Sequence, residues 1–274
     1  MKSESNMPYK VEVMKVTGLN AQTKSIRFHF VDNKVSREFT FVPGQFVIVS
    51  VPGFGEAALT ITTATLELPE FEIAVRSVGN TTQALHRLKT GDIAYIRGPL
   101  GEGAPFDKFY GQELLTIGGG IGLAPLRSII HTVRNNAPLA GSFKILYGAK
   151  TPEDLIFKNE LNSWNKFAET HITVDSADSE WRGETGMIVD VLKKIKVDKD
   201  AVAIICGPPI MYEGLVKELL SKGLLEENIQ LMLERRMRCG IGKCQHCTCG
   251  DKYVCVDGPT FSWKDLKDNW EAFK

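Results

Sequence analysis

Residues 114–136 read LLTIGGGIGLAPLRSIIHTVRNN: a short apolar run, a glycine-rich turn and a segment of helical character. This order favours a strand that turns sharply into a helix, because glycines adopt the backbone angles that such a turn requires. Glycines also let the turn approach a pyrophosphate closely, while the helix N-terminus offers free N–H groups to the negative charge. The alternative is a purely structural turn. The cofactor-binding candidates in this segment are Gly119, Gly120, Gly122, Ala124 and Pro125.

The same alternation continues toward the carboxyl end of the chain. Apolar runs at residues 143–149, 171–177 and 201–209 alternate with helix-like segments, which predicts βαβ units and a parallel sheet buried on both faces. The last run, AVAIICGPP, reaches Cys206 at a strand end, where doubly wound sheets bind their ligands. The alternative for Cys206 is a buried small apolar side chain. The candidates at this strand end are Cys206, Gly207, Pro208 and Met211.

The first 105 residues have a different texture, with short β-branched and aromatic runs separated by Gly and Pro. Runs of this kind predict an antiparallel barrel. The predicted strands are Tyr9–Val16, Thr23–Phe30, Phe46–Val51, Ala58–Thr62, Phe71–Val75 and Ile93–Arg97, with one helix at Thr82–Leu88. The expected fold class is therefore an all-β barrel plus an α/β domain with a doubly wound parallel sheet. The domain divisions that we expect are 1–108, 109–226 and a small cysteine-rich lobe at 227–274.

Two segments of the barrel half carry hydroxyl groups that suit a flavin. Hydroxyls on a strand edge can bond the polar rim of an isoalloxazine, and a Gly-Asn-Thr-Thr turn that opens a helix can seat a pyrophosphate. The alternative is that these threonines only form strands and cap a helix. The candidates are Ala58, Leu59, Thr60, Thr62, Val78, Gly79, Thr81 and Thr82.

Five of the six cysteines lie between Cys239 and Cys255, in a segment too short to form an apolar core, so we expect a metal centre to organise it. The ligands with C-x4-C-x2-C-x7-C spacing are Cys239, Cys244, Cys247 and Cys255. Such thiolates can surround a [2Fe-2S] cluster if Gly240 and Gly242 turn the loop tightly, although the gap of seven residues is shorter than in plant-type ferredoxins. The alternative is structural zinc, which more often uses two C-x2-C knuckles. We interpret His246 and Cys249 as bystanders.

Composition excludes several classes of protein. With 33 basic and 33 acidic residues the chain has no global positive field, so nucleic acid is not an expected partner. The sequence has no apolar stretch of membrane-spanning length, and its first ten residues have no apolar core for a secretory signal. We therefore expect a cytoplasmic protein without membrane insertion.

Taken in order, these motifs resemble the ferredoxin-NADP reductase superfamily. The narrower resemblance is to the branch that contains the gamma subunits of cytosolic nickel-iron hydrogenases (sulfhydrogenases), the B subunit of anaerobic sulfite reductase and the electron-transfer subunit of dihydroorotate dehydrogenase B. GEAALTITT resembles the flavin strand of this branch, RSVGNTTQAL its flavin-pyrophosphate turn, GGGIGLAP its nucleotide loop and CGPPIM its nicotinamide-side strand end. LERRMRCGIGKCQHC and YVCVDGPTF are similar to the cluster region of the hydrogenase and sulfite reductase forms.

One departure from the family pattern affects the flavin. Ala57 and Ala58 stand where the superfamily usually has Arg and Pro, so the flavin phosphates lack their usual cation, and we expect Arg76 to replace it. The resemblance implies FAD as the flavin. It also implies hydride transfer between nicotinamide and flavin, then single-electron steps through the cluster, so we expect no catalytic acid or base. Thr60 and Thr62 would orient the isoalloxazine, and Cys206 would lie near the nicotinamide.

The resemblance further implies a partner enzyme. The cluster motif favours catalytic subunits of a hydrogenase or sulfite reductase type, with additional iron-sulfur subunits. The alternatives are a dihydroorotate dehydrogenase complex, a stand-alone NAD(P)H-ferredoxin or acceptor reductase, and, more remotely, a non-enzymatic zinc-binding module. The choice between NAD and NADP stays open. Lys150, Lys158 and Arg182 are candidates for a 2′-phosphate contact, or else solvated surface charges.

Overall fold

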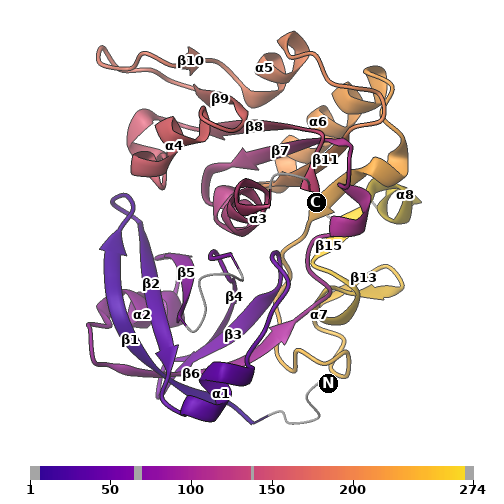
Figure 1. Cartoon of the computed structure of the whole chain (residues 1–274). Helices are drawn as coiled ribbons and strands as arrows, with labels where there is room; N and C mark the ends of the chain where they lie inside the picture. Colours follow the sequence, from indigo (N-terminus) through magenta and orange to yellow (C-terminus); the bar gives the residue numbers. More distant parts are fainter. Residues whose placement is uncertain (1–6, 65–69, 137–138, 269–274) are drawn as a thin grey trace.

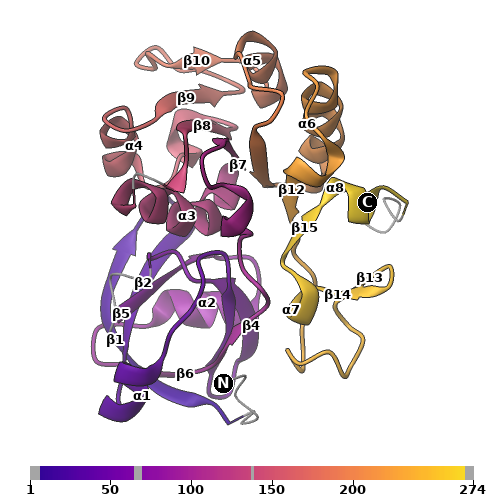
Figure 2. The same cartoon turned by 45° about the vertical axis from the view of Figure 1, so that its right-hand side comes forward.

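The chain folds into a β-barrel at one end, a helix-covered sheet at the other, and a cysteine-rich loop beside the barrel (Figures 1 and 2). The computed structural model describes residues 7–64, 70–136 and 139–268. Within these ranges no helix has the length and apolar character needed to cross a bilayer.

The barrel contains every strand predicted for this half of the chain. Its sheet has the order β4-β3-β6-β1-β2-β5, and all neighbouring strands are antiparallel. A bridge between Ile61 and Ile73 joins the continuation of β4 to β5 and closes the sheet. The elements are β1 (Tyr9–Gly18), β2 (Thr23–Phe30), α1 (Asn33–Glu38), β3 (Phe46–Val51), β4 (Gly55–Thr60), β5 (Glu70–Arg76), α2 (Asn80–Arg87) and β6 (Ile93–Leu100).

Alternating side chains fill the barrel because successive strand residues face opposite sides of a sheet. Ile26, Phe28 and Phe30 of β2 point inward and are buried. Phe28 stacks on Phe71 with ring centroids 5.6 Å apart, which contributes about 0.5–1.5 kcal/mol beyond area burial. The short helix α1 was not predicted, although Asp32 caps it by accepting from the amide of Lys34 at 2.7 Å.

The second half is the predicted doubly wound sheet. Its strand order is β10-β9-β8-β7-β11-β12-β15, and every neighbouring pair is parallel except β12 with β15. The elements are η2 (Phe106–Lys108), β7 (Glu113–Gly119), η3 (Gly120–Gly122), α3 (Leu123–Asn135), β8 (Ser142–Ala149), η5 (Pro152–Asp154), α4 (Lys158–Trp164), β9 (Glu169–Val174), β10 (Glu184–Thr185), α5 (Ile188–Lys194), β11 (Val202–Cys206), α6 (Pro209–Ser221), η6 (Glu226–Asn228), β12 (Ile229–Met232), β13 (Thr248–Cys249), β14 (Lys252–Tyr253), α7 (Val254–Asp257), β15 (Thr260–Ser262) and α8 (Trp263–Leu266).

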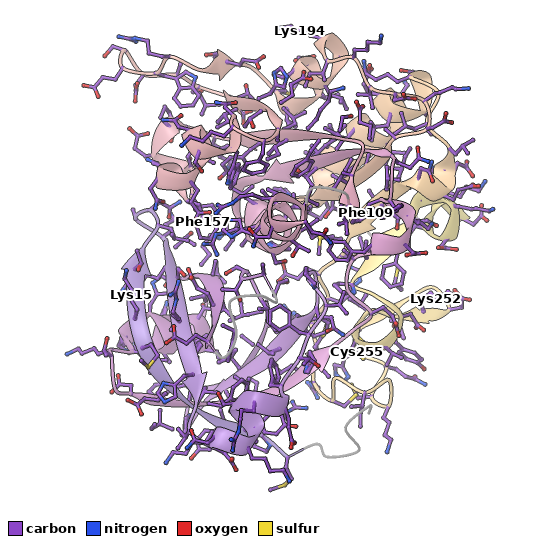
Figure 3. All side chains as sticks on the ribbon, in the orientation of Figure 1. Lys15, Phe109, Phe157, Lys194, Lys252 and Cys255 are labelled. Carbon is purple, nitrogen blue, oxygen red and sulfur yellow. The ribbon has the colours of Figure 1, made fainter. Side chains whose placement is uncertain are left out.

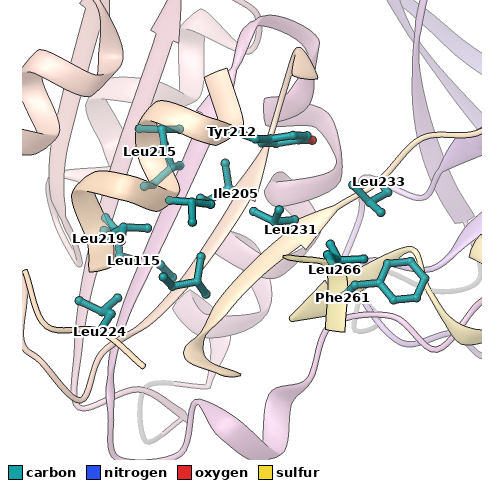
Figure 4. Close-up of a cluster of buried hydrophobic side chains, with 14 of the residues drawn as sticks. Leu115, Ile205, Tyr212, Leu215, Leu219, Leu224, Leu231, Leu233, Phe261 and Leu266 are labelled. Carbon is teal, nitrogen blue, oxygen red and sulfur yellow. The ribbon is translucent and has the colours of Figure 1, made fainter. Parts of the chain in front are cut away.

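Helices cover both faces of this sheet. Leu115 and Ile205 pack against Leu215 and Leu219 of α6 on one face (Figure 4), whereas Leu114 packs with α3 and α4 on the other. Each fully buried side chain of this kind contributes about 1.5–3 kcal/mol. Burial on both faces is the reason that the strands read as continuous apolar runs.

The strand order reverses between β7 and β11, which makes this edge the topological switch point. Gly118 of β7 pairs with Cys206 of β11. The glycine turn and the Cys206 turn therefore leave adjacent strands at the same carboxyl edge.

The cysteine-rich segment is packed more extensively than its composition indicated. Strands β12 and β15, both from the range expected to form a separate lobe, join the seven-stranded sheet. Phe261 and Leu266 belong to the same apolar cluster as α6. Apolar packing thus holds the ends of this segment, and the loop between them lies beside the barrel (Figure 2).

Candidate functional site

The glycine turn and the Cys206 turn touch each other at the switch point. A Cβ atom on Gly122 would overlap with the backbone carbonyl of Cys206, and one on Gly119 would overlap with the sulfur of Met211. Gly120 differs, because its φ of +54° lies in the left-handed region and a Cβ there would meet no atom within 4 Å. Two glycines therefore permit close packing of the turns, and the third permits the turn itself. Ala124 is buried and Pro125 half-buried in the first turn of α3.

Hydrogen bonds of Tyr212 hold the Cys206 turn in place. Its hydroxyl donates to the carbonyl of Met232 at 2.7 Å and accepts from the amide of Gly207 at 3.3 Å. Burial, with a smaller effect from Glu234, raises the pKa of the Cys206 thiol to about 12. This thiol is therefore neutral at physiological pH and places no charge at the switch point. Pro208, one residue before α6, is exposed.

The candidate flavin strand is β4 and the residues that follow it. Ala58, Leu59 and Thr60 are half-buried, whereas Thr62 is buried and its hydroxyl donates to the carbonyl of Glu72 at 3.0 Å. The next residue, Thr63, was not singled out from sequence. It is 1% exposed, and its hydroxyl has no hydrogen-bond partner in the described part of the chain.

The turn before α2 is held by its own threonines. Thr82 accepts from the amides of Val78 and Gly79, both at 2.9 Å, and thereby caps the helix. Thr81 donates to the carbonyl of Phe54 at 2.9 Å, which ties the turn to the β3–β4 hairpin. Arg76 is exposed at the end of β5, two residues before this turn.

Backbone amides of the cysteine loop are directed at two sulfur atoms. The amides of Ile241, Lys243 and Cys244 donate to Sγ of Cys239 at 3.4–3.5 Å, and the amide of Gly242 donates to Sγ of Cys255 at 3.2 Å. Gly240 and Gly242 have φ of +74° and +72°, as the tight turn requires. Amide-to-sulfur bonds stabilise thiolates and set cluster potentials, so this loop has the donor pattern of an iron-sulfur site.

The four thiols are neighbours in space. Cys244 faces Cys239, and Cys255 faces Cys247 and Cys239. Hydrogen bonds from the backbone near Cys239 and His246 lower the pKa of Cys244 to about 7, whereas burial and the adjacent Cys247 raise that of Cys255 to about 12. Within the described residues, no three His, Cys, Asp or Glu side chains form a site for a single metal ion.

The two expected bystanders make other contacts. His246 is exposed, and its Nδ1 lies 3.0 Å from the carbonyl of Cys244. Cys249 is buried in the β13–β14 hairpin, where it contacts Arg235 and where burial raises its pKa. That neither ligates a metal stays a prediction.

Arg97 of β6 anchors the cysteine loop to the barrel. Its guanidinium donates to the carbonyls of Cys239 at 2.8 Å and Arg238 at 2.9 Å, and pairs with Glu56 of β4 at 2.8 Å. A Cβ atom on Gly240 would lie 2.8 Å from Leu100 and 3.1 Å from Ile48, so the loop packs directly on the barrel. No spacing in the sequence pointed to Arg97.

The three coenzyme candidates lie on three different segments of the nucleotide half. Lys150 directly follows β8, the strand next to β7, and is exposed. Lys158 begins α4 and is also exposed. Arg182 lies in the loop before β10 at the sheet edge and donates to the carbonyls of Ser179 and Trp181.

Family models match three consecutive parts of the chain. Residues 10–104 match the oxidoreductase FAD-binding domain, and residues 116–217 match the oxidoreductase NAD-binding domain. Residues 234–267 match the iron-sulfur cluster binding domain of dihydroorotate dehydrogenase B. The chain is thus an oxidoreductase with FAD-binding, NAD-binding and iron-sulfur regions.

Curated relatives extend over almost the whole chain. Sulfhydrogenase 1 subunit gamma of Pyrococcus furiosus is 38% identical over 267 residues, which cover 94% of this chain and 91% of the relative. The probable dihydroorotate dehydrogenase B (NAD(+)) electron transfer subunit of the same organism is 34% identical, covering 85% and 84% of the two chains.

A solved structure shows the same fold at similar coverage. It comes from a study of flavin-based electron bifurcation in the NADH-dependent reduced ferredoxin-NADP oxidoreductase, with a TM-score of 0.75, 26% identity, and coverage of 98% of this chain and 94% of the other. The chain therefore belongs to the family of ferredoxin reductase-like electron-transfer subunits that contains the sulfhydrogenase gamma subunits and the dihydroorotate dehydrogenase B electron-transfer subunits.

Proposed function

We propose that this chain passes electrons between NAD(P)H and a partner redox enzyme through FAD and a [2Fe-2S] cluster held by Cys239, Cys244, Cys247 and Cys255. The observation that carries the proposal is the contact of the cysteine loop with the barrel through Arg97 and Gly240. Arg97 also pairs with Glu56 of the candidate flavin strand. The same barrel side chain thus contacts both the candidate flavin strand and the cysteine loop.

The two-iron cluster is favoured by ligand spacing and by the amide pattern. Four thiolates on one short loop supply two ligands for each iron. The amides around Cys239 and Cys255 offset the negative charge that these sulfurs would carry. A structural zinc ion, which also accepts four thiolates, is the outcome that would refute this assignment.

The residues of the chain bind and orient the reactants. Bound FAD supplies the conversion between two-electron and one-electron transfer. Gly120 leaves open space at the start of α3 for phosphates, with the helix N-terminus behind it. The neutral Cys206 thiol lies at the same edge. Because it carries no charge, it does not oppose the change of charge that the nicotinamide ring undergoes on hydride transfer. We propose flavin contacts at the half-buried residues of β4 and at the turn before α2.

The outer side of the cysteine loop is suited to a partner protein. Ile241 and Val256 are 39% and 37% exposed, and Gly242, which separates Ile241 from Lys243, lies against Val256. Residues 235–247 contain four basic and no acidic residues in a chain of zero net charge. This combination suits an apolar contact surrounded by acidic groups.

Among candidate partners, catalytic subunits of a hydrogenase or sulfite reductase type are favoured. The sulfhydrogenase relatives cover more of both chains, at higher identity, than the dihydroorotate dehydrogenase B relative described above. The match of residues 234–267 to the dihydroorotate dehydrogenase B cluster domain supports that complex as the second candidate.

Cofactor analysis of anaerobically purified protein tests the proposal. The expected composition is one FAD, two irons and two acid-labile sulfides per chain, with flavin bands in the visible spectrum. One zinc per chain without sulfide, or a colourless protein that does not take up FAD, would refute it.

A further inference from the structure

Arg127 is a buried charge at the junction of the two halves of the molecule. It projects from α3 and is 6% exposed. Its Nε and Nη2 lie 3.0 and 2.8 Å from the two carboxylate oxygens of Glu160 on α4, and its Nη1 donates to the carbonyl of Thr62 at 3.1 Å. One guanidinium thus joins two helices of the nucleotide half to the candidate flavin strand.

Two further side chains complete this arrangement, which we call the clamp (Arg127, His131, Phe157 and Glu160). Nε2 of His131 lies 2.8 Å from Oε2 of Glu160. The guanidinium of Arg127 lies over the ring of Phe157, 4.7 Å from the ring centroid. Phe157 has a φ of +53°, and Figure 3 shows it between the barrel and the nucleotide half. Paired charge, bidentate geometry and ring stacking together make a buried guanidinium stable.

The clamp acts on backbone at the centre of the proposed site. Thr62 lies in the candidate flavin strand, two residues after β4 ends, and the adjacent Thr63 is buried with a hydroxyl that has no hydrogen-bond partner among the described residues. On the other side, α3 begins at Leu123, immediately after the glycine turn and four residues before Arg127. Ser128 adds a second link by accepting from the amide of Gly44 at 3.3 Å.

From this geometry we infer that Arg127 is a positioning residue, which fixes the distance between the flavin strand and the nucleotide turn. The inference rests on the proposed function. In hydride transfer the C4–H bond of the reduced nicotinamide breaks, and its hydrogen and electron pair form the N5–H bond of the oxidised flavin, leaving the oxidised nicotinamide. The reacting atoms must lie about 3–3.5 Å apart, and a displacement of about 1 Å costs on the order of 100-fold in rate.

Arginine is required because its planar fork reaches Glu160 and Thr62 at the same time. Lysine has the same charge on a single ammonium group. Arg127→Lys therefore retains the ion pair with Glu160 and loses the hydrogen bond to the carbonyl of Thr62. Glu160→Gln keeps the shape and removes the charge that orients the guanidinium. Both variants preserve most of the packing, which makes them informative where Arg127→Met fails to fold or loses FAD.

Lys144→Met is the matched control. Lys144 and Glu113 form an ion pair of similar burial, 2.6 Å long, at the amino end of the same sheet. The other polar partners of Lys144, Glu169 and the carbonyl of Lys196, also belong to the nucleotide half. This variant therefore removes an ion pair of the nucleotide half without disturbing the junction.

The test uses the full FAD-loaded chain, with NADH in anaerobic stopped flow and hydrogen exchange of residues 61–64 as a readout independent of turnover. We expect Arg127→Lys to slow flavin reduction at saturating NADH by about fivefold or more, with FAD content and half-saturation unchanged. Exchange of residues 61–64 becomes faster in Arg127→Lys and Glu160→Gln, and neither change occurs in Lys144→Met.

The inference would be overturned if flavin reduction in Arg127→Lys slowed by less than about fivefold, or if it slowed equally in Lys144→Met. Failure of the wild-type flavin to accept electrons from NADH or NADPH would instead refute the proposed function. In that case the exchange comparison still decides whether the clamp holds Thr62.

Discussion

The guanidinium of Arg97 donates to the carbonyl of Cys239 across 2.8 Å, so a barrel strand directly holds the first cysteine of the proposed cluster. The two residues are separated by 142 positions in the chain. This contact places the proposed electron exit against the flavin-binding half of the molecule, away from the nucleotide turns at the switch point.

Replacing Arg97 is expected to loosen the cluster. Arg97→Ala leaves the part-buried carbonyl of Cys239 without this donor, at a cost of about 1–3 kcal/mol, whereas the exposed carbonyl of Arg238 can bond to water instead. We expect iron to be lost to a chelator about fivefold faster than from the wild type. Arg87→Ala is the control, because Arg87 stacks on Phe54 elsewhere on the barrel. Equal rates of iron loss in Arg97→Ala and the wild type would contradict the anchoring role.

Separating the two turns at the switch point is expected to weaken coenzyme binding. Gly122→Ala places a methyl group against the backbone of Cys206 and Gly207. This backbone cannot move away without distorting the turn. We expect a loss of about 1–3 kcal/mol in unfolding free energy and a roughly tenfold higher half-saturation for NADH. Gly214→Ala in α6 is the control, because its Cβ meets only Val189 at 3.8 Å, and it should stabilise by up to about 1 kcal/mol. Unchanged half-saturation in Gly122→Ala would remove this turn from the coenzyme site.

The charge of Glu160 in the clamp predicts that the folded state loses stability at low pH. Burial acts to raise the pKa of Glu160, but hydrogen bonds from His131 and Arg127 outweigh it and lower the pKa to about 2. A carboxyl pKa that is lower in the folded state gives stability that is present above about pH 4.5 and is lost as the pH falls toward 2.

Urea unfolding at pH 7 and pH 3 measures this effect. The wild type should lose about 2 kcal/mol more than Glu160→Gln between the two pH values, because the variant has no carboxyl group to protonate at this site. Glu153→Gln, at an exposed position in η5, should behave as the wild type. Parallel losses in the wild type and Glu160→Gln would show that the clamp does not depend on the charge of Glu160.

The basic side of the cysteine loop is expected to govern docking. Lys243→Glu should reduce electron delivery to an acidic ferredoxin by about tenfold at low salt, and the difference should shrink as salt screens the charges. Reduction of the flavin by NADH should be unchanged. Lys15→Glu is the control, since Figure 3 shows Lys15 on the side of the barrel away from Cys255. Equal effects of the two substitutions would place the docking surface elsewhere.

The parts of the fold that sequence could predict depend on local pattern. The apolar runs of β7, β8 and β11 and the alternating residues of β2 identify strands because burial imposes their periodicity. The cysteine spacing and the glycines between the first two ligands likewise follow from local turn geometry. Asp32 was a usable local signal for α1, because aspartate is a preferred N-cap.

The residues that sequence missed act over long separations. Arg127 and Thr62 are 65 positions apart, and no periodicity marks Arg127 as buried or Glu160 as its partner. From the amphipathic pattern of α3, an arginine is instead expected on the solvent-exposed face. The short strands β12 and β15 were missed as members of the sheet because three or four residues carry too little pattern to show which strand they join.

Rapid-freeze EPR after mixing the anaerobic protein with NADH or NADPH tests the proposed electron path most directly. We predict that flavin reduction is followed by the signal of a reduced two-iron cluster, and that Cys244→Ala abolishes this signal while the flavin is still reduced. Full reduction of the flavin with no paramagnetic cluster signal in the wild type would contradict this path.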